Sequence, residues 1–549
     1  MLLITIDTLR PDALGIIDAS RDTPAIDALA ESGRLFSSAV SPVPLTLPSH
    51  TSMLTGLLPV HHGVRDNGQT VPADAELLPV ILKNSGFSTG AFVSGFPLQA
   101  MFGLDRGFDR YDDVMNEGDQ GWVERRAEDT VKAASEWLQG QAGSQQPWFA
   151  WTHFYDPHDP YEPPREFWQP GPRGSYDGEV TYTDYWVGKL LETARAASGD
   201  RPLLIVLTAD HGEALGEHEE LTHGFFVYDS TMRVPLIISW PGRISPSRGT
   251  EPVQLIDLAA TILDLLDLPP LARTDGRSLA QGLTGGELAL HPALMETWLP
   301  WTYYGWAPLS AWLDGAWKLI DAPAMELYDV IKDPNEKSNL AEASPAVADR
   351  LGLDLGRMQA SAGRVAETSS DDEAMQRLRS LGYVGVGAPV EVPPDDLADP
   401  KSRIAMRNTL QQGEALLRAQ RYAQAAEIFA DVLATDPDNR FANLRQGIAF
   451  LRLNRIEEAT RVLKHAVEVE PHRAEARYAL GDALMRSEAF PEAADQWAVL
   501  AELQPRRKEA WFNLATALEK SGQAEQADIA MQEYRRLETE EATSGSAGP

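Results

Sequence analysis

The chain has 549 residues, of which 43% are hydrophobic and 23% are charged. This length exceeds what one hydrophobic core supports and predicts two or three domains, and the composition excludes a fibrous or wholly disordered protein. A formal net charge of −33 opposes binding to nucleic acids, so an anionic substrate would need a local positive centre. The absence of cysteine excludes disulfides and zinc–thiolate sites.

Membrane insertion is not expected. The most apolar helical stretch, residues 255–268, contains three aspartates and is shorter than the roughly 20 apolar residues that a membrane span needs. The first seven residues already have the pattern of a buried strand, which leaves no room for a signal peptide. We therefore expect a cytoplasmic protein as the sequence is written, and an extracytoplasmic one if translation starts upstream.

The first 340 residues alternate between two hydrophobic patterns. Apolar runs typical of buried strands alternate with segments of helical periodicity. This alternation predicts an α/β domain with a mostly parallel sheet covered by helices. The predicted strands are residues 2–6, 148–154, 203–208 and 234–239, and the predicted helices are residues 23–32, 124–138 and 184–197.

Acidic and histidine residues follow several predicted strands. Asp7 follows the first strand, Asp210 and His211 follow a later one, and the strand that contains His153 leads to residues 156–160, Asp-Pro-His-Asp-Pro. In a parallel sheet the catalytic groups gather beyond the carboxyl ends of the strands. Carboxylates and imidazoles that converge there predict a divalent-metal site.

Residues 46–63, Thr-Leu-Pro-Ser-His-Thr-Ser-Met-Leu-Thr-Gly-Leu-Leu-Pro-Val-His-His-Gly, resemble the nucleophile segment of sulfatases. Thr46 stands where sulfatases have a modified Cys or Ser, and His50 stands where they have arginine. In both differences, the chain is similar to phosphodiesterases and phosphoethanolamine transferases that use a Thr nucleophile. It also has a histidine, His223, in place of the sulfatase lysine, as phosphoethanolamine transferases do. Asn67 falls where such phosphodiesterases have an asparagine that binds a phosphoryl oxygen.

The resemblance to the alkaline phosphatase and sulfatase superfamily covers about residues 1–340 and implies a site. The implied metal ligands are Asp7, Thr46, Asp210 and His211, with a second cation at His223, His158 and Asp156. Zn²⁺ or Mn²⁺ is expected more than Ca²⁺ or Mg²⁺. Thr46, Asn67, His223 and His158 are the expected catalytic residues.

The side chain of Thr46 restricts the chemistry. Formylglycine forms by oxidation of a Cys or Ser side chain, and the extra methyl group of threonine prevents formation of an aldehyde. A hydroxyl activated by a divalent cation can instead attack phosphorus. We therefore expect hydrolysis or transfer of a small anionic phosphate ester, a phosphodiester or phosphomonoester, through a covalent Thr46 intermediate. A sulfatase that works without formylglycine is the alternative.

The middle of the chain is expected to complete the catalytic domain. Residues 317–339 resemble the small C-terminal α+β subdomain of sulfatases, which predicts a catalytic domain over residues 1–345 with this subdomain from about residue 295. Residues 346–402 are predicted to be a helical segment and a linker, because Gly, Pro and acidic residues interrupt any periodicity over residues 384–400.

The C-terminal part contains a 34-residue repeat. Gly413, Gly447, Gly481 and Ala515 recur at this spacing. The pattern resembles the tetratricopeptide repeat and predicts four repeats over residues 403–539, followed by a disordered tail over residues 540–549. Stacked helix pairs form a groove for a protein or peptide partner. A catalytically inert scaffold, and repeats that pack only against the catalytic domain, remain as alternatives.

Overall fold

A computed structural model describes residues 1–117, 123–363, 365–367, 377–378 and 396–544. The chain divides into two compact units. Unit 1 comprises residues 1–299 and 307–367, and unit 2 comprises residues 300–306 and 368–549. The linker predicted over residues 384–400 lies mostly outside the described residues, as do residues 545–549.

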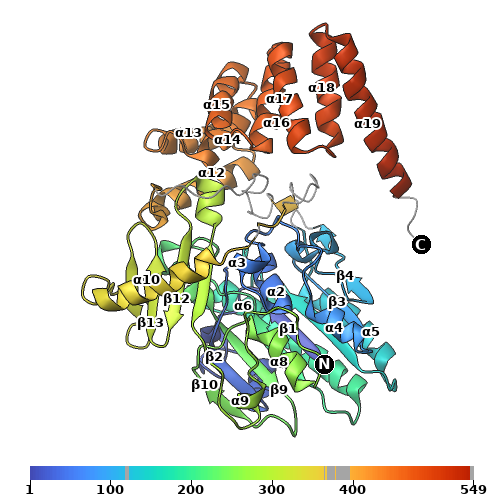
Figure 1. The fold of residues 1–549 in the computed structure, drawn as a ribbon, viewed down its shortest axis with the longest axis vertical. Coiled ribbons are helices and arrows are strands. Elements are labelled where there is room, and N and C mark those ends of the chain that lie inside the picture. Colours follow the sequence, from blue (N-terminus) through green and yellow to red (C-terminus); the bar gives the residue numbers. More distant parts are fainter. Residues whose placement is uncertain (118–122, 364, 368–376, 379–395, 545–549) are drawn as a thin grey trace. The chain divides into compact units, whose positions relative to one another are not determined.

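Unit 1 is built around an eight-stranded sheet (Figure 1). The strand order is β10-β2-β9-β8-β1-β7-β3-β4, and β9 alone runs antiparallel to its neighbours in this sheet. The predicted mostly parallel α/β fold is thus confirmed. The strands are β1 (Leu2–Ile6), β2 (Arg34–Val40), β3 (Ser88–Phe92), β4 (Arg110–Asp112), β7 (Trp148–Phe154), β8 (Ile205–Ala209), β9 (Arg233–Ser239) and β10 (Ser247–Gly249).

Strand β1 lies at the centre of the sheet and sets the position of the site. Its last residue, Ile6, pairs with Phe154 of β7 on one side and with Ala209 of β8 on the other. The residues that follow these three strands therefore leave the sheet at the same level and at the same edge. All five residues of β1 are buried, as expected for a strand covered on both faces.

Helices cover this sheet. In α1, Ile26, Leu29 and Ala30 are buried because their i, i+3, i+4 spacing puts them on one face. Helix α1 packs against α6, which packs against α5, and α2 packs against α3, α4 and α8. The helices are α1 (Pro24–Glu31), α2 (Thr46–Thr55), α3 (Pro59–His62), α4 (Leu78–Asn84), α5 (Ala127–Gln141), α6 (Gly174–Ser198), α7 (Asp229–Met232), α8 (Asp257–Leu265) and α9 (Ala280–Leu283).

A four-stranded antiparallel sheet forms the expected small subdomain. Its strands are β11 (Ala293–Thr297), β12 (Leu309–Asp314), β13 (Trp317–Asp321) and β14 (Glu326–Asp329), in that order. Helix α10 (Pro345–Ala360) packs against β12 and β13 and belongs to unit 1. Unit 1 thus continues beyond residue 345, where the sequence pattern placed its end. A two-stranded sheet of β5 (Asn116–Glu117) and β6 (Val123–Glu124) lies elsewhere in this unit.

Unit 2 consists of consecutive antiparallel helix pairs. Cβ atoms placed on Gly413, Gly447 and Gly481 would lie 2.6, 2.4 and 2.6 Å from the side chains of Phe429, Leu463 and Trp497, each 16 residues later. The small residue of each repeat therefore permits close packing of its two helices. The helices are α12 (Ile404–Arg418), α13 (Tyr422–Leu433), α14 (Arg440–Arg452), α15 (Ile456–Val469), α16 (Ala474–Arg486), α17 (Phe490–Leu503), α18 (Lys508–Lys520) and α19 (Ala524–Ser544).

The C-terminal helix is longer than the sequence pattern suggested. Helix α19 extends to Ser544, so residues 540–544 are helical rather than part of a disordered tail.

A short segment from the middle of the chain also belongs to unit 2. Residues 300–306 belong to this unit and begin with one π-helical turn, Pro300–Tyr304. The guanidinium of Arg440 lies 4.1 Å from the centre of the Trp301 ring. Tyr304 packs on Phe441 with ring centres 5.6 Å apart, and Trp306 Nε1 donates to Asp436 at 3.3 Å. The first repeats are thus completed by aromatic residues from outside the repeat sequence.

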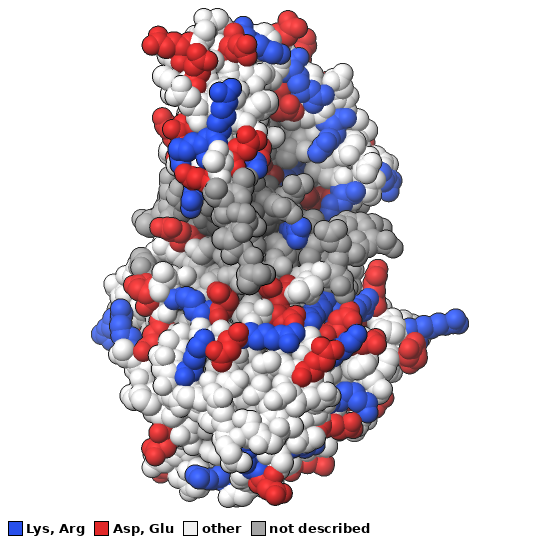
Figure 2. Space-filling model, turned by 90° about the vertical axis from the view of Figure 1, so that its right-hand side faces the viewer, with Lys and Arg blue, Asp and Glu red and all other residues white. Residues whose placement is uncertain are grey.

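Acidic and basic side chains both lie on the surface. On the face shown in Figure 2, acidic and basic side chains are interspersed and do not gather into a patch of one sign. Within the described part of the chain, no helix is both long and apolar enough to span a bilayer.

Candidate active site

Three buried side chains converge where β1 and β8 end. Asp7, Asp210 and His211 are completely buried. Asp7 Oδ1 and Asp210 Oδ2 each lie 3.5 Å from His211 Nε2, and none of these three atoms has a hydrogen-bond partner among the described residues. Burial raises the pKa of Asp7 to about 7. Unsatisfied polar atoms that face one another in a protein interior indicate a site for a ligand.

The local backbone fixes these three groups. His211 Nδ1 donates to the carbonyl of Gly212 at 3.0 Å, which leaves Nε2 as the acceptor nitrogen. Asp210 Oδ1 accepts from the backbone N–H of His211 at 2.9 Å, so Oδ2 remains available. Thr8, directly after Asp7, has φ of 56°, which is strained for a β-branched residue. Its hydroxyl donates to the carbonyl of Pro157 at 2.6 Å and holds this turn.

Thr46 is the first residue of α2 and is completely buried. Its hydroxyl donates to Asp7 Oδ2 at 3.3 Å, which places Oγ1 beside the carboxylate cluster. The unpaired N–H groups at a helix start favour negative charge. The structure therefore brings the predicted nucleophile, the predicted ligands and a helix N-terminus together.

Asn67 lies beside the start of the same helix. Its Oδ1 accepts from the backbone N–H of Leu47 at 2.9 Å, and its Nδ2 is buried without a hydrogen-bond partner among the described residues. The side chain is thus oriented by α2 and has an N–H donor left over. Such a donor next to Thr46 is suited to a phosphoryl oxygen.

His153 is a site residue that the motif analysis left out of the ligand set. It lies in β7 opposite Thr5 and is completely buried. Its Nε2 is 3.7 Å from Asp7 Oδ2, and neither ring nitrogen has a hydrogen-bond partner within the described structure. Burial lowers the pKa of His153 to about 4, so the ring is neutral at neutral pH and can offer a lone pair. The alternation of the strand, which places His153 on the same face as Thr5, was the available signal.

In contrast to His153, His50 uses both ring nitrogens in hydrogen bonds within the protein. Its Nδ1 donates to the carbonyl of Thr46 at 2.8 Å, and its Nε2 accepts from the hydroxyl of Thr5 at 3.0 Å. Thr5 Oγ1 in turn accepts from Trp151 Nε1 at 3.0 Å. Burial lowers the pKa of His50 to about 3. A neutral imidazole with both nitrogens engaged stiffens the first turn of α2, and the position where sulfatases have arginine carries no charge here.

Two further histidines lie next to this cluster. The ring centre of His223 is 4.4 Å from that of His211 and 4.9 Å from that of His158. His223 Nδ1 lies 3.2 Å from an oxygen of Glu213, whose other oxygen accepts from the hydroxyl of Tyr161 at 2.8 Å. Glu213 is completely buried, so it orients His223; the sequence analysis had not included it.

The predicted second ligand set consists of Asp156, His158 and His223. Asp156 Oδ1 lies 3.8 Å from Arg126 Nη1, and His158 Nδ1 donates to the carbonyl of Asp159 at 2.7 Å. Among the described residues, the groups with metal-ligand spacing are Asp7, Asp210 and His211, and His50, His153 and Asp210. Asp156, His158 and His223 do not form such a group, so the second cation remains a prediction.

The first group fits a divalent cation. Ligand atoms that are about 2.0–2.2 Å from a tetrahedral cation stand about 3.4 Å apart, close to the 3.5 Å separations around His211. Two carboxylate oxygens and one imidazole nitrogen are a suitable donor set for such an ion.

Comparison with known proteins identifies the families of both parts of the chain. Residues 1–268 match the sulfatase family, and residues 216–359 match the C-terminal region of N-sulphoglucosamine sulphohydrolase. Residues 416–468 and 444–501 match tetratricopeptide repeats. The chain therefore combines a sulfatase family domain with C-terminal tetratricopeptide repeats. The predicted superfamily is confirmed, as is the presence of C-terminal tetratricopeptide repeats.

Similar proteins cover the sulfatase domain. The chain is 28% identical over 352 residues to N-acetylgalactosamine-6-sulfatase of Canis lupus familiaris, with 53% of this chain and 67% of that protein covered. It is 29% identical over 258 residues to choline-sulfatase of Rhizobium meliloti (strain 1021), with 38% and 49% covered. The phosphonate monoester hydrolase of Agrobacterium radiobacter has the same fold, with a TM-score of 0.55, 21% identity, and 65% and 95% of the two chains covered. The two sulfatases agree with the family match over the sulfatase family domain, and the phosphonate monoester hydrolase shows a shared fold.

Proposed function

We propose that this sulfatase family protein cleaves or transfers a phosphate ester, a phosphodiester or phosphomonoester, with Thr46 as the nucleophile. The observation that carries the proposal is the position of Thr46 Oγ1, 3.3 Å from Asp7 Oδ2 at the start of α2. In the first step Thr46 Oγ1 bonds to phosphorus while the bond from phosphorus to the leaving oxygen breaks. Water or another alcohol then releases the phosphoryl group from Thr46.

Asp7, Asp210 and His211 would hold a divalent cation, and we add His153 to this set because its Nε2 lies 3.7 Å from Asp7 Oδ2 and it has metal-ligand spacing with Asp210. When bound, the cation would lower the pKa of the Thr46 hydroxyl and neutralise charge on the transferred group. The imidazole nitrogens favour Zn²⁺ or Mn²⁺ over Ca²⁺, which prefers oxygen ligands.

The remaining residues support binding and departure of the leaving group. Asn67 Nδ2 has no hydrogen-bond partner among the described residues and would donate to a phosphoryl oxygen, while its Oδ1 accepts from the backbone N–H of Leu47. Glu213 orients His223 through Nδ1, and we assign His223, with His158 beside it, to protonation of the leaving oxygen.

Turnover of matched nitrophenyl phosphodiester, phosphomonoester and sulfate esters tests this function. We expect a phosphate ester to be the best substrate. Thr46→Ala should lower its turnover by about 10³-fold or more while metal binding persists, and Thr46→Ser, which restores a hydroxyl, should recover part of the activity. An unchanged rate in Thr46→Ala would contradict a Thr46 nucleophile.

Sulfate-ester hydrolysis without formylglycine is the second candidate. It is supported by the similarity to N-acetylgalactosamine-6-sulfatase and choline-sulfatase. The same assay separates the two functions, because a sulfatase of this kind would turn over the sulfate ester fastest.

We further propose that the repeats recruit a protein or peptide partner to the enzyme. Tandem helix pairs form an extended groove, which is a common surface for peptide recognition. The alternative of an inert scaffold predicts no turnover of any of the three esters by metal-loaded protein.

A further inference from the structure

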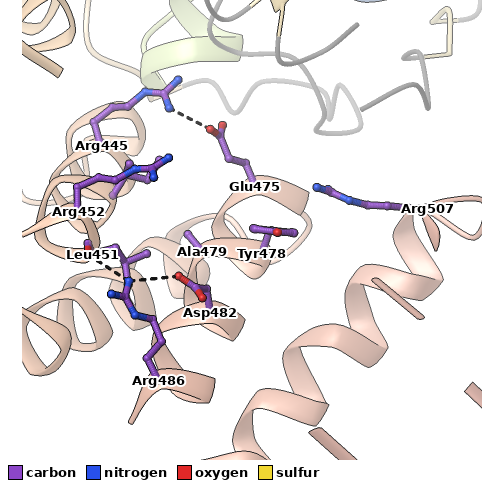
Figure 3. Close-up of a pocket in the computed structure, with 10 residues that line it drawn as sticks. Arg445, Leu451, Arg452, Glu475, Tyr478, Ala479, Asp482, Arg486 and Arg507 are labelled. Atoms are coloured by element: carbon purple, nitrogen blue, oxygen red, sulfur yellow. Dashed lines mark hydrogen bonds and ion pairs between the residues drawn. The ribbon is translucent and has the colours of Figure 1, made fainter. Parts of the chain in front are cut away.

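The repeats contain a pocket of about 580 Å³, and its polar lining has a structural explanation (Figure 3). Arg445 of α14 pairs with Glu475 of α16 at 2.9 Å, and Arg486 of α16 donates to the carbonyl of Leu451 of α14 at 3.1 Å. Both contacts join the first helices of successive repeats and hold them together. A second group of buried polar contacts, at the end of β11 in unit 1, instead reaches the site.

Glu296, the fourth residue of β11, contacts two segments that lead to site residues. Its backbone N–H donates to the carbonyl of Pro42, four residues before Thr46, at 2.9 Å. Its carboxylate pairs with the guanidinium of Arg65, two residues before Asn67, at 2.5 Å. Both of these charged side chains are buried, and each balances the charge of the other. The small subdomain therefore packs directly against the segments that carry the nucleophile and Asn67.

Thr297, the next residue of β11, contacts the segment that carries His223. Its hydroxyl donates to the carbonyl of Gly224 at 2.5 Å and accepts from the backbone N–H of Leu299 at 3.3 Å. Thr297 is completely buried, so water cannot replace its bond to Gly224. Gly224 directly follows His223. Thr297 therefore fixes the backbone at the position from which the imidazole of His223 extends.

Gly224 has no room for a side chain. Its φ is 93°, in the left-handed region, and a Cβ atom would lie 2.9 Å from Leu299 Cδ1 and 3.3 Å from Leu45 Cδ2. Leu45 directly precedes Thr46, so the turn that carries His223 lies against the start of the nucleophile helix. A shift of this turn would move the imidazole relative to Thr46. The hydrogen bond to the carbonyl of Gly224 opposes such a shift.

We propose that Thr297 is a positioning residue, which holds His223 at the leaving oxygen of the substrate through the carbonyl of Gly224. The inference rests on the role of His223 in the proposed function and adds to it a residue from the small subdomain. Glu213 orients the imidazole, and Thr297 sets its place. A misplacement of about 1 Å can lower a rate by about 10²-fold, so loss of this one hydrogen bond should be measurable in turnover.

The test compares two esters of the class that the enzyme prefers, one with nitrophenol and one with benzyl alcohol as the leaving group. Nitrophenolate departs without a proton, whereas the benzyl alkoxide needs one, so the benzyl ester depends more on His223. Thr297→Val keeps the shape of the side chain and removes the hydroxyl. We expect it to lower the ratio of benzyl to nitrophenyl turnover by about tenfold or more, and Thr297→Ser to keep the ratio within about twofold of the unmodified protein. Each ratio is measured in one sample, so it does not depend on how much of the protein is folded.

Thr261→Val is the matched control. Thr261 is also completely buried, donates to the carbonyl of Asp257 at 2.7 Å and accepts from the backbone N–H of Leu279 at 2.9 Å. Its substitution should lower stability to a similar extent and leave the ratio unchanged. His223→Gln sets the scale, because it removes the imidazole and should lower the ratio by about 10²-fold.

An unchanged ratio in Thr297→Val, with a lowered ratio in His223→Gln, would overturn the positioning role and leave the proposed function standing. The positioning role would also be wrong if Thr261→Val lowered the ratio equally, or if Thr297→Ser lowered it as much as Thr297→Val. An unchanged ratio in His223→Gln would overturn both this inference and the assignment of His223 to the leaving oxygen. Failure of the proposed nucleophile is seen separately, as normal turnover by Thr46→Ala.

Discussion

His153 differs from the other buried histidines of unit 1 in having no hydrogen bond to the described residues at either nitrogen. By contrast, His50 and His62 use ring nitrogens to hold the backbone or hydroxyl groups around α2 and α3. Burial of an unsatisfied imidazole costs free energy, and a bound cation would recover that cost. We therefore expect His153 to take part in metal binding.

Substitution tests this assignment directly. His153→Gln should weaken binding of Zn²⁺ or Mn²⁺ to the metal-free protein by about 10- to 100-fold, measured by calorimetric titration. His62→Gln, which removes a buried histidine that bonds Ser52 instead, is the matched control and should leave metal affinity unchanged. Equal affinity of both variants would show that His153 is a structural residue.

His61 links three segments of unit 1 and should make its stability depend on pH. Its Nδ1 lies 2.7 Å from Asp275 Oδ2 and its Nε2 lies 2.9 Å from Ser361 Oγ. The hydrogen bond to Asp275 raises the pKa of His61 above its ordinary value. A raised pKa in the folded state gives stability that is present below pH 6.5 and is lost as pH rises through the folded pKa.

His61→Gln should therefore cost more stability at pH 5.5 than at pH 8.5. We expect the unmodified protein to have a higher free energy of unfolding than His61→Gln at pH 5.5. This difference should be smaller by about 1 kcal/mol at pH 8.5. Urea unfolding of both proteins at each pH, with residual turnover after dilution as the signal, measures these free energies. If the difference in free energy of unfolding were larger at pH 8.5 than at pH 5.5, the pKa of His61 would not be raised by folding.

The sequence placed Asp7, Asp210 and His211 together because they follow strands of one sheet, and Thr46 with them because its segment resembles the sulfatase nucleophile motif. The structure brings these four side chains together, and their chemical roles stay predictions. The sequence did not identify Glu213, because its role depends on its contact with His223. For His153 the strand alternation indicates the face on which the ring lies, but not that both ring nitrogens lack a hydrogen bond to the described residues.

At the scale of the elements, hydrophobic periodicity located helices and strands well where nothing interrupts it. Strands β1 and β7 have the predicted bounds, residues 2–6 and 148–154. Helix α6 begins at Gly174, ten residues before the predicted start, because two glycines there resemble a loop. A Cβ atom on Gly174 would lie 1.9 Å from the carbonyl oxygen of Gln169, so glycine is required by the preceding loop and not by the helix.

The glycines of the repeats offer a test at this scale. Gly481→Ala places a Cβ atom 2.6 Å from the ring of Trp497, which is 2% exposed and cannot turn away. We expect a loss of about 1–3 kcal/mol in the stability of unit 2. Gly356→Ala, in α10, meets no atom within 4 Å and should instead stabilise unit 1 by about 0.5–1 kcal/mol.

Calorimetric unfolding of the two variants measures both effects, and turnover of a small ester should be normal in each. If Gly481→Ala were as stable as the unmodified protein, close packing of the repeat helices at this position would not be what requires glycine.

At the scale of the whole molecule, the sequence separated the catalytic and repeat parts because their periodicities differ. It did not show that residues 300–306 belong to unit 2, since a short aromatic segment between two strands has no repeat signature. This segment affects whether unit 1 can be produced without unit 2. Trp301, Tyr303, Tyr304 and Trp306 are at most 6% exposed in the intact chain.

Truncation after residue 400 removes the helices against which this segment packs, so its four aromatic side chains become exposed. We expect the truncated protein to keep turnover of a small ester, because unit 1 has its own sheet and site, but to aggregate through the new apolar surface. Light scattering should show this, and a truncated variant with Trp301→Ser, Tyr304→Ser and Trp306→Ser should stay monomeric with the same turnover per molecule. A monomeric truncated variant that is folded but inactive would show that catalysis requires the repeats. The assignment of catalysis to unit 1 alone would then be wrong.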